Sequence, residues 1–219
     1  MFFKKKNILI QGKNNKIELS GDSKIPNGLK IIIKGDNNSI LVDSGINFRD
    51  SVFKINSSNN TIVVKPTKHL VMLDILINHG DNQSCIIEKN FSSAENTKIW
   101  LIEPNCSLEI GEDCMVSTDV HFIASDGHCI FANDLLVNSS KGIKIGKHVW
   151  IGAHARILKN AIVPDNSIVG SCSVVTKSSN VSKKKGGVIL AGNPAMVVKK
   201  DICWDRKSIN SYKKESNEL

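Results

Sequence analysis

The chain has 219 residues, of which 41% are hydrophobic and 23% charged, close to the averages of globular proteins, so a largely disordered chain is excluded. Its size fits one domain or at most two small ones. Aromatic residues make up only 5% of the chain. The core must therefore be built from Ile, Val and Leu, and the β-branched residues among these favour strands.

The chain is basic, with 29 Lys and Arg against 21 Asp and Glu and a formal charge of +8. Much of the excess lies in three runs, at residues 4–6, 183–185 and 199–214. These runs lack the alternating aromatic pattern of proteins that stack nucleic-acid bases. We therefore expect no nucleic-acid partner, and instead an anionic small ligand or peripheral contact with an anionic surface.

The six cysteines lie far apart, with no Cys-x-x-Cys pair and no His at the spacing of a zinc site, so no metal centre is predicted. Buried free thiols in a reducing compartment fit this pattern. The apolar stretch Ile8 to Ile10 is too short for a signal peptide, and no later run is long enough to predict a transmembrane segment. The expected location is the cytoplasm.

The amino-terminal half repeats one short phrase. Residues 14–19 (NNKIEL) return as residues 37–42 and 59–64, with weaker copies at 82–87 and 105–110, so that the period is 22 or 23 residues. Each copy places Asn, a turn residue, just before a short apolar run that predicts a strand. Strands this short bury their apolar face only when they stack on one another. The repeat therefore predicts a solenoid.

The carboxy-terminal half has a period of six. β-branched residues stand at every sixth position and mostly small residues stand four positions after them; the two series are Ile145, Ile151, Ile157, Val163, Val169, Val175 and Val149, Ala155, Ala161, Ser167, Ser173. No α-helix has this period, and a two-sided sheet needs only a period of two. Six residues per side and three sides per turn predict an all-β fold, a triangular parallel β-helix.

We expect one continuous domain with three parts. Residues 1–107 would form irregular amino-terminal coils, residues 108–182 the six-residue-repeat coils, and residues 183–219 a basic loop with a carboxy-terminal extension. Residues 126–144 are polar and lack the period of six. Because solenoids accommodate insertions as loops, this segment predicts a loop that protrudes from the β-helix.

Three segments resemble a known family. They are residues 145–153 (IGKHVWIGA), 168–177 (IVGSCSVVTK) and 191–199 (AGNPAMVVK). They are similar to the hexapeptide-repeat acyltransferases, most of all to the sugar, capsular-polysaccharide and sialic-acid O-acetyltransferases. The resemblance extends over residues 108–202 and implies a left-handed parallel β-helix. It also implies transfer of an acetyl group from acetyl-CoA to a hydroxyl of a sugar or surface glycan of a capsule, lipopolysaccharide or sialic acid.

The resemblance also implies two catalytic residues. His128, in the segment 125–128 at the root of the predicted loop, matches the family's general base. Neutral imidazole suits removal of a hydroxyl proton near pH 7. Asp126 is a candidate to hold the other ring nitrogen, and His121 is the alternative base. Trp150 matches a tryptophan that lies beside the acyl donor in related enzymes, with packing against a neighbouring subunit as the alternative.

The expected co-substrate is acetyl-CoA. By the same resemblance its binding residues are Ala153, Ser171, Thr176, Lys177 and Lys199. Small side chains would let the pantetheine arm approach the backbone, and lysines would supply point charges for its phosphates. The resemblance further implies a homotrimer with sites in the clefts between subunits.

Two other functions stay open at this point. One is an N-acetyltransferase that acts on a nucleotide-linked amino sugar, which differs from the favoured function by a free amine on the acceptor. The other is a catalytically inactive β-helix that serves as a binding or scaffold protein, because folds of this kind also act as platforms. Binding of CoA would separate an enzyme from a scaffold. The sequence does not identify the sugar or the hydroxyl.

Overall fold

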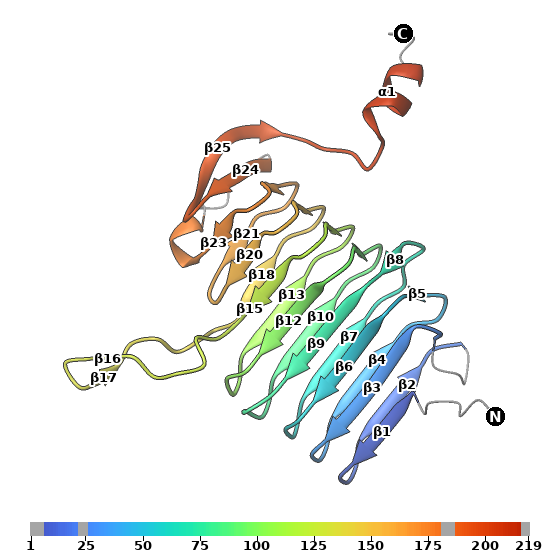
Figure 1. The fold of residues 1–219 in the computed structure, drawn as a ribbon, viewed down its shortest axis with the longest axis vertical. Coiled ribbons are helices and arrows are strands. Elements are labelled where there is room, and N and C mark those ends of the chain that lie inside the picture. Colours follow the sequence, from blue (N-terminus) through green and yellow to red (C-terminus); the bar gives the residue numbers. More distant parts are fainter. Residues whose placement is uncertain (1–6, 22–25, 181–186, 216–219) are drawn as a thin grey trace.

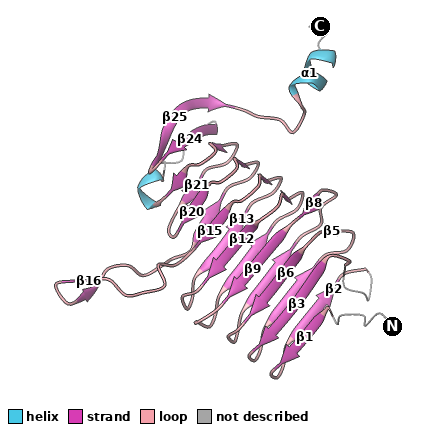
Figure 2. Cartoon of the chain, in the orientation of Figure 1, coloured by secondary structure: helices cyan, strands magenta, loops and turns pink. Residues whose placement is uncertain are grey.

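The computed structural model describes residues 7–21, 26–180 and 187–215. Within them the chain winds into a three-sided parallel β-helix from which one long loop protrudes (Figure 1). Strands dominate, and the helices of the described part are the 3₁₀ helix η1 (Lys177–Ser179) and α1 (Ile209–Glu215) in the carboxy-terminal extension (Figure 2). The predicted left-handed parallel β-helix with a protruding loop is confirmed.

Each side of the β-helix is built from parallel strands that stack coil upon coil. Side A consists of β1 (Ile8–Gln11), β3 (Leu29–Lys34), β6 (Ser51–Ile55), β9 (Leu73–Ile77), β12 (Thr97–Leu101), β15 (His121–Ile123), β20 (Arg156–Leu158) and β23 (Val174–Val175). Side B consists of β2 (Lys16–Leu19), β4 (Ser39–Val42), β7 (Thr61–Val64), β10 (Ser84–Ile87), β13 (Ser107–Ile110), β18 (Ile143–Ile145) and β21 (Ile162–Val163).

Side C is formed by two sheets. The pair β5 (Asn47–Phe48) and β8 (Leu70–Val71) comes first, and a six-stranded sheet follows it along the solenoid. That sheet contains β11 (Ser92–Ser93), β14 (Met115–Val116), β19 (Trp150–Ile151), β22 (Ile168–Val169), β24 (Gly187–Gly192) and β25 (Ala195–Ile202). Only β25 in this sheet is antiparallel to its neighbour, so it folds back over the last coil.

The two sequence periods are the lengths of two kinds of coil. In the amino-terminal half, Phe53 pairs with Ile75, 22 residues later, on side A. In the carboxy-terminal half, Ile157 pairs with Val175, 18 residues later. The longer coils have strands of four to six residues on sides A and B, whereas the shorter coils have strands of two or three.

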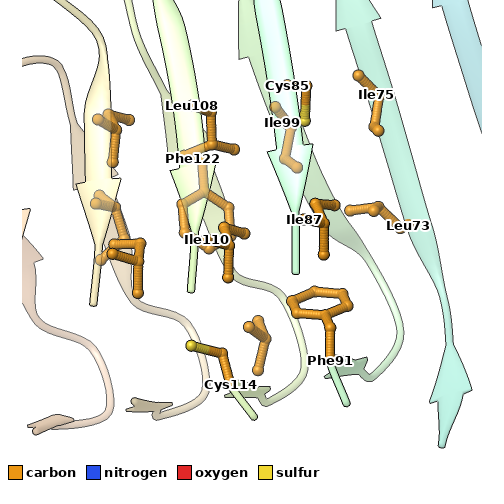
Figure 3. Packing of buried hydrophobic residues seen from close by; sticks show 14 of the residues in the cluster. Leu73, Ile75, Cys85, Ile87, Phe91, Ile99, Leu108, Ile110, Cys114 and Phe122 are labelled. Atoms are coloured by element: carbon orange, nitrogen blue, oxygen red, sulfur yellow. The ribbon is translucent and has the colours of Figure 1, made fainter. Parts of the chain in front are cut away.

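The core is one continuous cluster of inward side chains. All eleven residues of the two six-residue series are at most 2% exposed, so the predicted inward positions are confirmed. The large residues Phe53, Phe91 and Phe122 are also almost fully buried. Figure 3 shows how Leu108, Ile110 and Phe122 of one coil pack beside Cys85, Ile87 and Ile99 of the preceding coil. Side chains in equivalent positions therefore lie one above another along the solenoid.

A ladder of side-chain amides runs inside the corner between sides A and B. Asn38 Nδ2 donates to Asn15 Oδ1, and Asn60 Nδ2 donates to Asn38 Oδ1, each at 3.0 Å. The backbone N–H of Gln83 continues the ladder with a 2.9 Å bond to Asn60 Oδ1. The preceding residue, such as Asn59 with φ of 59°, has the left-handed backbone that Asn tolerates. The repeated Asn pair thus supplies a turn residue and a buried amide.

The free energy of unfolding should depend on this ladder. Asn60 is fully buried, and Asn60→Ala leaves the Asn38 and Gln83 groups without their partner, so the change should cost about 1–3 kcal/mol. Urea unfolding of the two proteins measures the difference. Asn59→Gly is the matched control, because glycine accepts the same backbone angles. Equal losses from both substitutions would contradict a role for the ladder.

The cysteines divide into two groups. Cys85, Cys106 and Cys114 are buried, whereas Cys129, Cys172 and Cys203 are exposed, and all six are free thiols. Burial raises the pKa of Cys85 and Cys114 to about 12. The prediction of buried thiols is therefore correct for three residues and wrong for the other three, which lie on the loop, at an outward corner and after the last strand.

The protruding loop leaves side A after β15 and returns to side B at β18. It ends at Gly142, earlier than the predicted residue 144, because Ile143 and Ile145 are buried in the core. A Cβ on Gly142 would lie 2.1 Å from the Ser107 carbonyl oxygen, so the return needs glycine. The loop carries a hairpin of β16 (Phe131–Ala132) and β17 (Leu135–Leu136), whose two turn residues have positive φ angles as in a type I′ turn.

Candidate active site

A groove of about 780 Å³ runs under the root of the protruding loop, along side B and its corner with side A. Loop residues Asp126 and Asn138 line one wall. Thr176 and Lys177, two of the residues that the sequence predicts for acetyl-CoA binding, line the end formed by later coils. Thr176 caps η1 by accepting a hydrogen bond from the backbone N–H of Ser178. The exposed Lys177 lies in the first turn of η1.

The loop root is fixed by a small polar network. Lys159 Nζ bonds the Asp126 carboxylate and the Asn138 carbonyl oxygen. Asn138 Nδ2 also donates to Asp126 Oδ2 and to the His128 carbonyl oxygen, each at 2.8 Å. The hydrogen bond from Lys159 lowers the pKa of the Asp126 carboxyl, against the opposing effect of burial. The Asp126 carboxylate thus bonds Lys159 and Asn138, and within the described residues no hydrogen bond joins it to the His128 ring.

His128 is exposed on the loop. Among the described residues its ring has no hydrogen-bond partner, so both ring nitrogens stay available to a ligand. Trp150 lies on side C, in β19, with 37% of its surface exposed and Nε1 at 3.4 Å from Ser117 Oγ. The loop leaves from the corner between sides A and B. Within one chain, His128 and Trp150 therefore lie on different sides of the three-sided β-helix.

Ala153 and Ser171 occupy equivalent places at the corner between sides C and A, one coil apart. The backbone N–H of Cys172 donates to the Ala153 carbonyl oxygen at 2.8 Å, which fixes the two coils against each other. Ala153 is half-buried and Ser171 exposed, so both border open surface. Lys199 is exposed on β25 and pairs with Ile189 of β24. The seven predicted residues thus lie in three regions. These are the corner between sides A and B with its loop (His128, Thr176, Lys177), the corner between sides C and A (Ala153, Ser171) and the sheet of side C (Trp150, Lys199).

Asp119, His154 and Arg156 form a polar cluster beside Ala153 that was not predicted from the sequence. His154 Nδ1 lies 3.0 Å from Asp119 Oδ2, and Arg156 binds the same carboxylate oxygen at 2.8 Å. The hydrogen bonds from Arg156 and His154 hold the pKa of Asp119 well below its ordinary value. If Nδ1 donates to the carboxylate, Nε2 of the half-exposed His154 is left as a proton acceptor.

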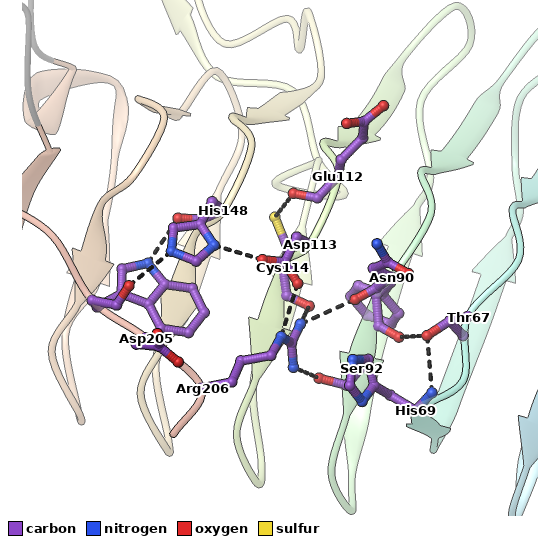
Figure 4. A network of polar contacts seen from close by, with 12 residues as sticks. Thr67, His69, Asn90, Ser92, Glu112, Asp113, Cys114, His148, Asp205 and Arg206 are labelled. Atoms are coloured by element: carbon purple, nitrogen blue, oxygen red, sulfur yellow. Dashed lines mark hydrogen bonds and ion pairs between the residues drawn. The ribbon is translucent and has the colours of Figure 1, made fainter. Parts of the chain in front are cut away.

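The carboxy-terminal extension crosses side C (Figure 4). The Trp204 ring stacks on His148 with centroids 4.1 Å apart, and Arg206 Nε donates to Asp113 Oδ1 at 2.8 Å. The extension therefore runs back along the solenoid rather than over its end. Sequence patterns alone treat His148 as an outward coil residue, since its partner Trp204 lies 56 residues away.

The described residues contain no group of three or more His, Cys, Asp or Glu side chains placed to hold a metal ion. None of their helices has the length and apolar character needed to cross a bilayer.

The segment with the six-residue repeat matches a known protein family. Residues 142–177 match the bacterial transferase hexapeptide family (six repeats). Over 142 residues the chain is 31% identical to the polysialic acid O-acetyltransferase of Neisseria meningitidis, with 64% of each protein covered. Over 109 residues it is 41% identical to the polysialic acid O-acetyltransferase of Escherichia coli O1:K1 / APEC, with 48% of this chain and 34% of that protein covered. The chain thus spans less than two thirds of the length of these relatives.

Two solved structures share the fold. The polySia specific acetyltransferase NeuO matches with a TM-score of 0.77 and 22% identity, covering 98% of this chain and 100% of that one. The polysialic acid O-acetyltransferase OatWY matches with a TM-score of 0.53 and 24% identity, covering 95% and 96%. The resemblance to the hexapeptide-repeat acyltransferases is confirmed. The two relatives from Neisseria meningitidis and Escherichia coli are both polysialic acid O-acetyltransferases.

The titration of His121, the alternative base, follows from its surroundings. Its Nε2 is buried without a hydrogen bond, although Asp119 Oδ1 lies 3.3 Å away. Burial, and then repulsion by the Arg156 guanidinium, lower the pKa of His121 below its ordinary value of 6.5. Its ring is therefore neutral at pH 7, but the buried Nε2 is poorly placed to meet a substrate.

NMR titration of the histidine rings tests this account. The His121 midpoint should lie below 6.5, since burial disfavours the imidazolium. Arg156→Gln should raise that midpoint, because it removes the nearby positive charge. His154→Gln is the control, since this residue is not among the causes of the shift. A His121 midpoint at or above its ordinary value would refute the account.

Proposed function

We propose that this protein is an acetyl-CoA-dependent O-acetyltransferase that acts on a sugar hydroxyl of a surface glycan, and that the glycan is an acidic one of the sialic-acid type. The observation that carries the proposal is a hexapeptide-repeat β-helix interrupted once by a loop that bears His128 at its root. The names of the two curated relatives support the acidic glycan. A cytoplasmic location stays a prediction.

The surfaces of the chain suit both substrates. Ala153 and Ser171 leave one corner free of large side chains, where a pantetheine arm could lie against the backbone. Lys141 and Lys177 line the groove and have no carboxylate partner among the described residues. They could attract phosphates of acetyl-CoA or carboxylates of an acidic glycan. Exposed Lys199 supplies another cation near the last coil.

His128 is proposed as the general base. Its neutral ring takes the proton from the sugar hydroxyl while the hydroxyl oxygen attacks the thioester carbonyl carbon. The tetrahedral intermediate then collapses, the carbon–sulfur bond breaks, and CoA leaves as a thiolate that recovers a proton from the imidazolium. Trp150 is proposed to lie beside the acyl donor, where its indole N–H could orient the thioester.

A homotrimer would bring these residues together. The loop exposes five apolar side chains, between 50% and 70% of whose surface is accessible: Ile130, Phe131, Leu135, Leu136 and Val137. Monomeric proteins rarely leave such a patch uncovered. The loop points away from its own solenoid (Figure 1). A cyclic trimer would place it on the next subunit, with its His128 near that subunit's side C.

The first test is activity. The protein should transfer acetyl from acetyl-CoA to an oligosialic acid, measured by CoA release and by the mass of the glycan. His128→Ala should reduce kcat about a hundredfold or more, with acetyl-CoA binding in calorimetry unchanged. His121→Ala should reduce kcat far less.

Three results would contradict the proposal. One is the absence of acetyl-CoA binding at millimolar concentration, which would favour a scaffold. The second is transfer to an amino sugar but to no hydroxyl acceptor in a panel of sugars and capsular oligosaccharides. The third is a larger kcat loss for His121→Ala than for His128→Ala, which would place the base on β15.

The second test addresses the shared site. His128→Ala subunits and Ser171→Trp subunits should each be inactive, the first for lack of the base and the second because the indole blocks the donor corner. Trimers formed by unfolding and refolding the two together should regain part of the activity, because some clefts then combine two intact halves. Light scattering verifies the trimer. A monomer, or no recovery in verified mixed trimers, would refute intersubunit sites.

A further inference from the structure

The segment from residue 203 to residue 208, here called the strap, is held on side C by two anchors. The first is Trp204, which stacks on the His148 ring at 4.1 Å with an interplanar angle of 11° and donates from Nε1 to the His148 carbonyl oxygen at 2.8 Å. The second is Arg206. Its guanidinium donates to Asp113 Oδ1, Ser92 Oγ, and the carbonyl oxygens of Asn90 and Cys114, at 2.8 to 3.0 Å (Figure 4).

The His148 ring is held on both sides. Nδ1 lies 2.6 Å from Asp113 Oδ2, and Nε2 lies 2.9 Å from the Trp204 carbonyl oxygen. The ring therefore links the corner residue Asp113 to the strap, and the stacked Trp204 ring covers its face.

The carboxylate in this network stays ionised. Burial alone would raise the pKa of Asp113, but hydrogen bonds from His148 and Arg206 outweigh it and lower that pKa. The Asp113 carboxylate joins the two anchors, since Oδ2 contacts the His148 ring and Oδ1 accepts a hydrogen bond from Arg206.

Trp204 is also the neighbour of Trp150. The centroids of the two rings are 6.1 Å apart and their planes meet at 45°. The strap thus forms a wall beside the residue proposed to contact the acyl donor. In the described part of the chain, the Trp150 indole also has a 3.4 Å hydrogen bond to Ser117 Oγ, so loss of Trp204 would leave the indole held less firmly.

We propose that Trp204 and His148 are positioning residues for Trp150, since the His148 ring holds the strap and Trp204 on the strap fixes the Trp150 indole. The role of Trp150 in donor binding rests on the proposed function, whereas the coupling among the three rings does not. The strap therefore strengthens acetyl-CoA binding without taking part in the chemical step.

The coupling is tested by NMR of the full-length protein with labelled Trp. His148→Gln should shift the indole signals of both Trp204 and Trp150, because the strap loses the ring on which Trp204 stacks. Trp204→Ala should shift the Trp150 signal, because the neighbouring ring is lost. Ile209→Ala, a change of an exposed residue after the strap, is the control and should leave both indole signals unchanged.

The consequence for binding is tested by steady-state kinetics. Trp204→Ala should raise KM for acetyl-CoA about fivefold, the scale of one lost contact, while kcat changes little. Trp204→Phe, which keeps a ring for stacking, should recover part of the loss. His148→Gln, which removes the ring under Trp204, should also raise KM with little change in kcat.

The outcomes separate the two proposals. Coupled indole signals without acetyl transfer to any acceptor would support the strap and refute the proposed function. Acetyl transfer with an unchanged KM in Trp204→Ala would refute the positioning role. A Trp150 indole signal that is unchanged in His148→Gln would refute the coupling through the strap.

Discussion

The structure depends on the register between successive coils. Each coil hydrogen-bonds to the preceding one residue by residue, so that Ile151 pairs with Val169 and Ile157 with Val175. A position in one coil therefore has an equivalent position directly above it, about 4.8 Å away. Inward positions stack into the core, and corner positions stack into columns. The amide ladder of Asn15, Asn38 and Asn60 is one such column.

One coil connects the loop, the next coil and the strap. It carries an aspartate at each of its three corners, and each is paired with a cation from a different place: Asp113 with Arg206 of the strap, Asp119 with Arg156 of the next coil, and Asp126 with Lys159, which ties down the loop root. The pKa of all three carboxyls is lowered. The electrostatic organisation of the site is therefore set in a single turn of the solenoid.

The inward residues were predictable because burial in a three-sided coil imposes a period that no helix or flat sheet shares. The corner pairs were not, because the loop separates Asp119 from His154 by 35 positions where the regular coil has 18. A search for a six-residue period therefore cannot align Asp119 with His154 across the loop. Trp204 was not predicted for another reason, since the chain reverses between β24 and β25 and the strap then reaches coils far earlier in the sequence.

The pairing of strands in the solenoid does not depend on the length of the protruding loop. β13 pairs with β18 and β15 with β20 as if the intervening residues were absent, and Gly142 closes the junction against Ser107. Closing a loop twice as long costs only about 0.6 kcal/mol more in chain entropy. The segment with His128 is thus an exchangeable module on a fixed frame. New acceptor preferences could arise by grafting or lengthening this segment, with no repacking of the core.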